Sequence, residues 1–554
     1  MSNLKILPLG GMGGVTQNMY VYEYDNEIMI VDCGIGFPDI QMYGVDIVLP
    51  DISYLLKQVN AGKTIVGMVL SHGHDDHIAA TGYLLPQLPE FPIYAAALTA
   101  GFAQNRMKDM GVGREVQVIK DGQPVTLGQN FSVETLAVTH SVPDTKHLII
   151  KTPAGIVYHG TDFKFDESPV DGVKSDYARM EAIGREGVLL ALSDCLRVEK
   201  NETIGSESNV GPVILAHMRE VKGKVLATMM SSHLHRIQQT VNAAVELGRK
   251  VVFVGRSVEQ NVQIALELKK LFIPAGFMID KREMSDFPDN ELCIIIAGSQ
   301  GQEGSSLVRA VYGEHREVSI GPSDKVIFSA DAIPGNEIPY YQSIDQLFKN
   351  GVEVVYPEIE PGIHQSGHAS APEQLQLLKL LQPKYAMPIG GADRHRVLYE
   401  RRVAAQANLD RQHTILPESG QIVEVGEGRV SFGQTVELHP QTVDGLGIGD
   451  VGKLVLSDRK ALSQSGMIVV VIPRQGKQLR LDNIQVISRG FVFMKEADEV
   501  IAFIQKRVAE IIDSLGKKTK DGEIRKAIEK RLGRSIYKII KREPVVLTAI
   551  VDLK

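Results

Sequence analysis

The residues best suited to chemistry lie in one short segment, residues 71–77, which carries three histidines and two aspartates. Imidazole nitrogens and carboxylate oxygens are the ligands that a borderline-soft divalent metal such as zinc prefers. The segment directly follows an apolar run, Thr64–Leu70, that predicts a buried β-strand. A tight loop at a strand end can direct alternate side chains at two adjacent ions. The expected ligands are His72 and His74 for one metal, and Asp76 and His77 for the other. A polar surface loop without metal is the alternative, but side chains crowded in this way would perturb one another's protonation.

Two further polar residues follow predicted strands in the same way. His140 follows the run Val133–Val138, and Asp162 follows the run Ile156–Tyr158. A histidine or aspartate alone at a strand end is usually structural. Beside the first motif, however, the sequence predicts that both residues join the metal site.

The elements that must position these residues change in character along the chain. Over about the first 165 residues, short apolar runs alternate with turns, which predicts strands whose polar ends lie together. From about residue 210 to 350, strand-like runs such as Lys224–Thr228 and Lys250–Val254 flank helical stretches such as Arg236–Leu247. This order is typical of βαβ units in a parallel sheet, so we expect an inserted α/β domain.

A helix is expected directly after the Gly367-His368 turn. Ser370 and Glu373 have the spacing of a capping box, and the helical pattern of Gln374–Leu381 ends at Pro383. Backbone N–H groups at the start of a helix favour an anion, so this turn is a candidate anion site.

The composition is that of an ordinary globular protein, with 44% hydrophobic and 23% charged residues. No apolar run reaches the roughly 18 residues of a membrane span, and the N-terminus lacks the pattern of a signal peptide, so we expect a cytoplasmic protein that does not associate with a membrane. Cys33, Cys195 and Cys293 are widely separated, which predicts buried thiols and neither a disulfide nor a thiolate metal site.

Charge is distributed unevenly along the 554 residues. The net charge is −7, but residues 501–550 hold 13 Lys and Arg against 6 Asp and Glu, so this stretch carries +7 and the rest −14. The basic stretch belongs to a C-terminal segment that predicts a small α/β domain after a Gly-rich connector. A solvated helical surface and a nucleic-acid-contacting face both explain it.

The H-x-H-x-D-H loop with the downstream His140 and Asp162 resembles the metal-binding motifs of the metallo-β-lactamase superfamily. Nearly the whole chain is similar to ribonuclease J of the β-CASP branch. The order and spacing of further segments carry this resemblance: Pro8-Leu9-Gly10-Gly11, Phe163-Lys164-Phe165-Asp166, Ser232-His233-Leu234-His235, Gly255-Arg256-Ser257, Gly298-Ser299-Gln300-Gly301, Ile333-Pro334-Gly335-Asn336-Glu337 and His364-Gln365-Ser366-Gly367-His368-Ala369-Ser370.

The resemblance implies an α/β protein with a metallo-β-lactamase αββα sandwich, an inserted β-CASP α/β domain and a small C-terminal α/β domain. The implied boundaries are 1–200 and 351–425 for the two parts of the core, 201–350 for the β-CASP domain, 426–455 for a linker and 456–554 for the C-terminal domain.

The resemblance also implies a site for two zinc ions and RNA. His72, His74 and His140 would bind one zinc, Asp76 and His77 the other, and Asp162 would bridge them. Asp76 and His368 would be catalytic, and the phosphate-binding residues would be His364, Ser366, Gly367, His368 and Ala369. His368 would contact the scissile phosphate or aid the leaving oxygen; the alternative is that it only caps the helix. Asp32 and Asp194 match acidic positions of the family, or simply orient loops.

The implied activity is zinc-dependent hydrolysis of RNA phosphodiester bonds, as a 5′-to-3′ exonuclease and, as a further expectation, an endonuclease. It would serve RNA maturation, including rRNA processing, and RNA decay. The family also implies a homo-oligomer, a dimer or a tetramer.

Two positions, Gly390 and Asp331, depart from the family pattern. Gly390 stands where the family has a histidine that completes the second metal site, so we expect that metal to bind weakly unless His395 reaches it. Asp331 replaces a small hydroxyl residue that lines a pocket for a 5′-phosphate, and its carboxylate would repel that phosphate. A catalytically weakened subunit that binds RNA or pairs with an active relative therefore remains open. So does an enzyme that acts on DNA or on a small ester, because the metal site does not read the sugar.

Overall fold

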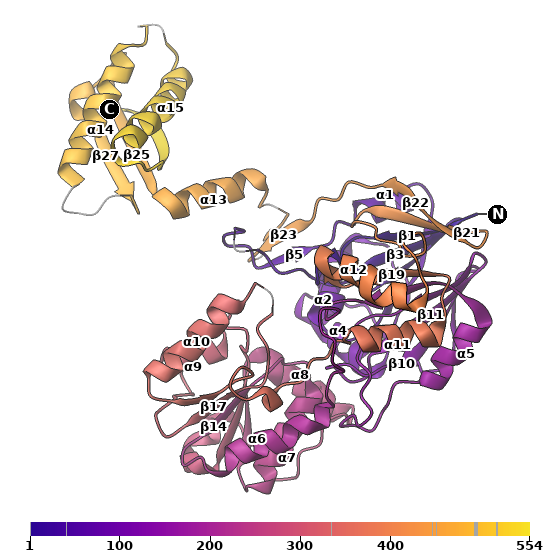
Figure 1. The fold of residues 1–554 in the computed structure, drawn as a ribbon. Coiled ribbons are helices and arrows are strands. Elements are labelled where there is room, and N and C mark those ends of the chain that lie inside the picture. Colours follow the sequence, from indigo (N-terminus) through magenta and orange to yellow (C-terminus); the bar gives the residue numbers. More distant parts are fainter. Residues whose placement is uncertain are drawn as a thin grey trace. The chain divides into compact units, whose positions relative to one another are not determined.

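The computed structural model describes residues 2–39, 41–333, 335–445, 447–449, 451–491, 497–516 and 519–553. Pro334, in the segment at 333–337 singled out above, lies outside these residues. The chain divides into two compact units, Met1–Phe37 with Val48–Gln441, and Pro38–Ile47 with Thr442–Lys554 (Figure 1). Among the described residues, no helix combines the length and apolarity that a membrane crossing requires.

The larger unit contains an eight-stranded sheet in the order β22-β21-β1-β3-β4-β6-β7-β8. Its strands are β1 (Leu4–Pro8), β3 (Tyr20–Tyr24), β4 (Glu27–Val31), β6 (Thr64–Leu70), β7 (Ile93–Ala95), β8 (Val116–Val118), β21 (Gln421–Gly426) and β22 (Arg429–Thr435). Strands β4 and β6 are parallel, so the residues that follow them, Asp32 and Ser71, lie at one edge of the sheet.

A six-stranded sheet faces it, in the order β19-β13-β12-β11-β10-β9. Its strands are β9 (Val125–Leu127), β10 (Phe131–Ala137), β11 (Lys146–Thr152), β12 (Gly155–His159), β13 (Val188–Asp194) and β19 (Tyr385–Ile389). Strands β12, β13 and β19 are parallel, which brings Asp162, Asp194 and Gly390 to a common edge.

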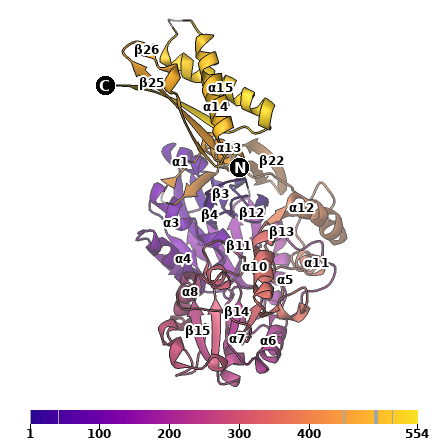
Figure 2. The same ribbon diagram turned by 90° about the vertical axis from the view of Figure 1, so that its left-hand side faces the viewer.

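Apolar side chains from both sheets form one core between them. A second cluster on the outer side of the six-stranded sheet includes side chains of α5 (Tyr177–Gly187) and α11 (Ala371–Leu381). Helix α4 (Ala97–Asp109) contacts β7 and β8 of the other sheet. The layers are therefore helix, sheet, sheet and helix, as the αββα expectation required (Figure 2). Strands such as β13, buried along their whole length, read as continuous apolar runs because both faces are covered.

The inserted domain is built on a parallel five-stranded sheet in the order β15-β16-β14-β17-β18. Its elements are α6 (Val210–Arg219), β14 (Val225–Thr228), α7 (Leu234–Glu246), β15 (Lys250–Val254), α8 (Arg256–Glu267), β16 (Leu292–Ile296), α9 (Ser306–Val311), β17 (Lys325–Phe328), α10 (Glu337–Lys349) and β18 (Glu353–Val355). Side chains of α9 and α10 cover one face of the sheet, and α6 and α7 lie on the other side (Figure 1). The predicted succession of strand, helix and strand at 224–254 is confirmed.

The smaller unit has its own sheet, with β25 (Met467–Gln475) between β26 (Gln478–Leu479), β27 (Gln485–Arg489) and the parallel β28 (Val545–Asp552). Helices α14 (Ala497–Asp513) and α15 (Asp521–Ile540) form one apolar core with this sheet. The expected small α/β domain is present. Five further strands are short: β2 (Met12–Gly13), β5 (Ile47–Leu49), β20 (Gly391–Ala392), β23 (Gln441–Asp444) and β24 (Gly447–Ile448). Further α-helices are α1 (Ser53–Asn60), α2 (Asp75–Ile78), α3 (Thr81–Leu84), α12 (Asp393–Tyr399) and α13 (Lys453–Ser465).

Candidate metal centre

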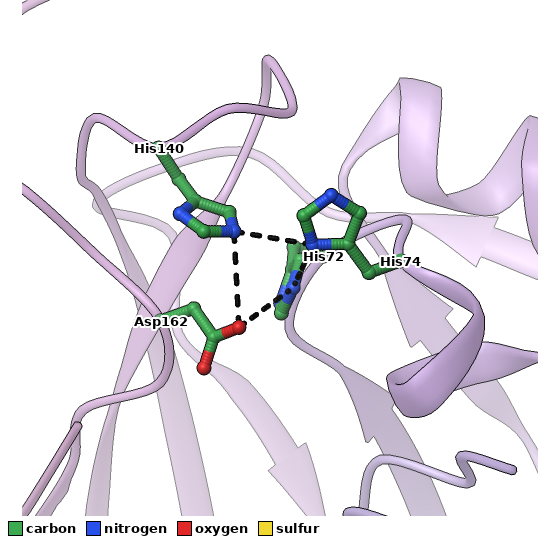
Figure 3. A group of neighbouring side chains, drawn as sticks. All are labelled: His72, His74, His140 and Asp162. Atoms are coloured by element: carbon green, nitrogen blue, oxygen red, sulfur yellow. Dashed lines mark hydrogen bonds and ion pairs between the residues drawn. The ribbon is translucent and has the colours of Figure 1, made fainter. Parts of the chain in front are cut away.

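Four side chains that follow three different strands point toward one another (Figure 3). They are His72 and His74 after β6, His140 after β10, and Asp162 after β12. Their ligand atoms all lie within 4.8 Å of one another. His74 Nδ1 is 3.1 Å from Nε2 of both His72 and His140, and Asp162 Oδ2 is 3.6 Å and 3.8 Å from the same two atoms. Tetrahedral ligands at zinc bond lengths lie about 3.3 Å apart, so this donor set fits an ion of that size.

A second donor group shares the carboxylate of Asp162. His77 Nε2 is 3.6 Å from Asp162 Oδ2 and 3.8 Å from Asp76 Oδ2. The structure therefore brings together all six residues that the sequence proposed as metal ligands, in two groups that meet at Asp162.

Hydrogen bonds behind the site orient the histidine rings. His140 Nδ1 donates to the carbonyl of Gly367 at 2.6 Å, and His77 Nδ1 donates to Asp32 at 2.7 Å. Each bond leaves the Nε2 lone pair directed into the site, as a metal ligand requires. Asp32 is held in turn by the backbone N–H and the hydroxyl of Ser71, at 2.7 and 2.8 Å. Asp32 thus orients a ligand from behind. A side chain at Gly367 would meet His140 at 3.0 Å, which explains the glycine there.

Burial and neighbouring carboxylates act in opposite directions on the pKa values of the proposed ligands. Burial lowers the pKa of His77, but Asp162, Asp32 and Asp76 outweigh burial and raise it well above its usual range. Burial lowers the pKa of His72 well below its usual range and that of His74 to about 3, so both rings are neutral and able to bind metal. Burial also raises the pKa of Asp76 to about 6.

At His368, as at His77, neighbouring carboxylates hold the imidazole pKa above its usual range. Burial lowers the pKa of His368, but the carboxylates of Asp194 and Asp162 outweigh burial and raise the pKa to about 9. His368 Nδ1 lies 2.9 Å from Asp194 Oδ2, and Nε2 lies 4.0 Å from Asp162 Oδ2. The ring is therefore a proton donor beside the metal-binding atoms. The alternative that His368 only caps α11 is wrong, because the N-cap residue is Ser370, which forms the predicted capping box with Glu373.

Several backbone N–H groups of this turn, which the sequence predicted to be free, are already paired within the protein. The N–H of His368 donates to Ser366 Oγ at 3.1 Å, that of Ala369 to Phe163 O at 2.6 Å, and that of Ala371 to Lys200 O at 3.1 Å. Ala369 is fully buried. His364, Ser366, Gly367 and His368 line a cleft at the site, so an anion there would meet their side chains and the Gly367 backbone.

Gly390 lies beside the metal-binding carboxylates. An added Cβ would lie 3.8 Å from Asp162 Oδ1 and 3.9 Å from Asp194 Oδ1, so a side chain there would reach the metal centre. Gly390 has φ = +66°, a left-handed conformation that glycine adopts easily. His395, on α12, lies 3.7 Å from Glu199 and is not part of any donor group among the described residues.

Asp331 lies across the cleft from the core and is not isolated. Its Oδ2 is 3.6 Å from Arg197 and 3.6 Å from His364 Nε2. Burial raises the pKa of Asp331, and Arg197 opposes that rise. The carboxylate of Asp331 and the guanidinium of Arg197 therefore face each other.

Sequence reasoning missed two further residues at the site. Asn18 Nδ2 lies 3.1 Å from His77 Nε2 although 59 positions separate them, and no local pattern signals such a contact. Ser141 Oγ lies 3.3 Å from His74 Nε2, and its place directly after His140 was the available signal.

Two packed sheets with His and Asp donors at their strand ends define a hydrolase of the metallo-β-lactamase fold, here with a parallel α/β insertion. Residues 12–167 match the Metallo-beta-lactamase superfamily, 222–347 the Ribonuclease J beta-CASP domain, and 454–553 the Ribonuclease J C-terminal domain. The chain is 34% identical to Ribonuclease J 1 of Streptococcus pyogenes, over 99% of this chain and 98% of that protein. It is 32% identical to Ribonuclease J2 of Bacillus subtilis, over 100% and 99%. The chain belongs to the ribonuclease J family.

The fold also recurs among solved structures. A protein of unknown function from Enterococcus faecalis V583 matches with a TM-score of 0.51 and 16% identity, over 76% of this chain and 100% of that one.

Proposed function

We propose that the protein is a zinc-dependent ribonuclease that hydrolyses RNA phosphodiester bonds, as a 5′-to-3′ exonuclease and also as an endonuclease. Its family consists of metal-dependent nucleases. One observation carries the proposal: three donor groups share Asp162, the third being Asp162, Asp194 and His368, and His368 Nε2 lies 4.0 Å from the Asp162 carboxylate. The arrangement supports paired divalent ions with an acid beside them.

The residues have separate roles in this reaction. His72, His74, His140 and Asp162 would hold one zinc, and Asp76, His77 and Asp162 the other. Bound zinc supplies Lewis acidity and makes water nucleophilic near neutral pH. Asp76 accepts a proton from the attacking water. His368 Nε2 donates its proton to the leaving 3′ oxygen, so the product carries a 5′-phosphate, while Asp194 fixes the ring through Nδ1.

The cleft at the site suits a polyanion. His364, Ser366, Gly367 and His368 would bind substrate phosphate, and Ala369 shapes the turn from its buried position. Four cationic side chains also line the cleft: Arg106, Arg197, Lys200 and Arg394. Arg106, Arg197 and Arg394 pair with acidic residues of the same cleft, namely Asp75, Asp331 and Glu199. Lys200 is the cation of this set without an acidic partner among the described residues, and two bound zinc ions would add the positive charge that favours phosphates.

We also propose that the enzyme is a cytoplasmic homo-oligomer that matures and degrades RNA, including rRNA; the family membership supports this. The alternative of an inactive RNA-binding subunit is not favoured, because the first donor group is complete.

Matched single-stranded RNA and DNA oligonucleotides of one sequence test the proposal. The zinc-loaded enzyme should cleave the RNA to products with 5′-phosphate ends and leave the DNA intact. Equal cleavage of the DNA, or no cleavage of either, would overturn it.

A further inference from the structure

The cleft beside the metal centre has one aromatic wall residue other than histidine. The cleft has a volume of about 410 Å³, and Phe37 is the only Phe, Tyr or Trp among the described residues that line it. Its side chain is 48% exposed. A single exposed apolar residue is ordinary on a protein surface. The position of Phe37, rather than its exposure, therefore carries the argument.

The backbone before Phe37 is attached to the metal-binding loop. Cys33 N–H donates to His77 O at 2.7 Å, and Ile35 N–H donates to Asp75 O at 3.2 Å. At Gly34 a Cβ would lie 1.6 Å from Asp76 O, so only glycine permits the close approach of the two loops. The backbone that leads to Phe37 is thus held at a fixed place relative to Asp76.

Gly36, which directly precedes Phe37, is held by a second segment of the chain. It exchanges two backbone hydrogen bonds with Val48, at 2.7 and 2.9 Å. A binding surface whose position is set before the ligand arrives loses little entropy when it binds.

We infer that Phe37 is a stacking platform for a nucleobase of the bound RNA. When an RNA phosphate lies at the metal centre, the adjoining bases can pack against the cleft walls. Every base has a π face, and stacking on an aromatic ring is tolerant of sequence. The charged side chains of the cleft serve phosphates, whereas Phe37 offers the flat apolar surface that a base requires. This inference rests on the proposed function, because it specifies how that site holds its substrate.

The chain has no tryptophan, so Phe37→Trp creates a single fluorescent reporter at the platform. We expect single-stranded RNA to quench its emission in rapid mixing, before cleavage. An abasic oligonucleotide of equal length and charge should not quench it, because it has no base to stack. Phe432→Trp is the matched control, with a similar exposure of 51% on β22 and outside the cleft. Equal quenching by abasic and normal RNA, or none by either, would overturn the inference.

Kinetics provide a readout that a structural role would not reproduce. Phe37→Ala should raise KM for normal RNA about tenfold or more with little change in kcat, and Phe37→Trp should retain the parental KM. Phe37→Leu should resemble Phe37→Ala, since it keeps apolar area but not the π face. On abasic RNA, the parent and Phe37→Ala should have equal KM values. If Phe37→Ala raises KM equally on normal and abasic RNA, or raises it on neither, stacking is contradicted. The proposed function would still stand in that case, provided that the parent cleaves RNA. A parent that neither binds nor cleaves RNA would instead refute the proposed function.

Discussion

At the scale of single residues, the carboxylate of Asp162 ties the two donor groups together. We expect Asp162→Ala and His74→Ala to reduce RNA hydrolysis about a thousandfold or more, because each removes a ligand from the site that activates water. Single-turnover cleavage of labelled RNA and zinc analysis measure this. His413→Ala, at an exposed histidine outside the cleft, should leave both unchanged. Full activity in either ligand variant would refute the metal mechanism.

The donor count predicts an order of metal loss. In the proposed two-metal site, Asp76, His77 and Asp162 would supply three ligands to the second metal, against four at the first. Fewer ligands lower affinity, so mild chelation should pass through about one zinc per chain, and activity should fall with the weaker ion. Metal analysis during dialysis against a chelator tests this. Two zinc ions that leave together would show that another residue completes the second site.

Gly390→His should strengthen that second site. A side chain at 390 points toward Asp162, and an imidazole there adds the missing ligand. The left-handed φ of +66° opposes the change by about 1 kcal/mol, although histidine tolerates this conformation better than most residues. Zinc content should rise toward two per chain and turnover should increase. Gly390→Ala carries the same backbone strain without a ligand, so a gain in that variant as well would exclude ligation as the cause.

Asp331 should set the response to the 5′ end of the RNA. The carboxylate of Asp331 forms an ion pair with Arg197. Asp331→Ser therefore removes a negative charge that would repel a terminal phosphate, and it leaves Arg197 free to bind that phosphate. We expect the preference for 5′-monophosphate over 5′-hydroxyl RNA to increase on the order of tenfold in kcat/KM. Asp345→Ser removes the same charge from an exposed position of α10 and should have no effect. A strong preference for 5′-monophosphate in the parent would show that the assigned role is wrong.

At the scale of elements, the start of α11 depends on one buried carboxylate. Glu373 accepts hydrogen bonds from Ser370 N, Ser370 Oγ and Phe165 N at 2.9, 2.7 and 3.0 Å. Glu373→Ala leaves these buried donors unpaired and should lower the free energy of unfolding by about 3 kcal/mol. Urea unfolding measures this, with exposed Glu181→Ala on α5 as the control, expected to change it by less than about 0.5 kcal/mol. Equal stability of the two variants would contradict the role of Glu373.

Elements with strong local patterns were predictable from the sequence. Strand β6 begins and ends as predicted, and β15 does too, because each is an apolar run bounded by polar residues. The start of α11 was predictable because the capping box is a local interaction. The clustering of the six proposed ligands was predictable because each follows a recognisable strand.

Contacts between distant segments were not predictable in this way. The ion pair between Arg197 and Asp331, and the contact between Asn18 and His77, depend on how whole sheets and domains pack. The hydrogen bonds that N–H groups of the 366–371 turn donate were not predictable, because acceptors such as the carbonyls of Phe163 and Lys200 lie on other segments. Sequence periodicity reports local conformation and burial, but it does not report which segments meet.

At the scale of the whole molecule, α15 carries six of the thirteen basic residues of the C-terminal stretch. Arg525, Lys526, Lys530 and Arg534 are exposed, and none of them has an acidic partner among the described residues. Replacing all four with Gln should weaken RNA binding about tenfold at low salt and flatten its salt dependence, with little change in the chemical step. The control replaces four exposed basic residues of the larger unit, Arg185, Lys222, Lys269 and Arg411, with Gln. If the fourfold α15 variant binds RNA as tightly as the parent and with the same salt dependence, the basic stretch is a solvated helical surface and not an RNA-contacting face.

The order of strands in the two catalytic sheets has a consequence for synthesis on the ribosome. Strand β13 is covered by β19, and β1 by β21, although both covering strands come after the inserted domain. Roughly 190 residues separate Asp194 at the end of β13 from Tyr385 at the start of β19. At about 5–20 residues per second, translation of that stretch takes about 10–40 s. Throughout this interval two apolar strands present unpaired edges, which are the surfaces through which nascent chains associate wrongly. Expression yield should therefore depend on translation speed through the insertion and on chaperones that bind open strand edges.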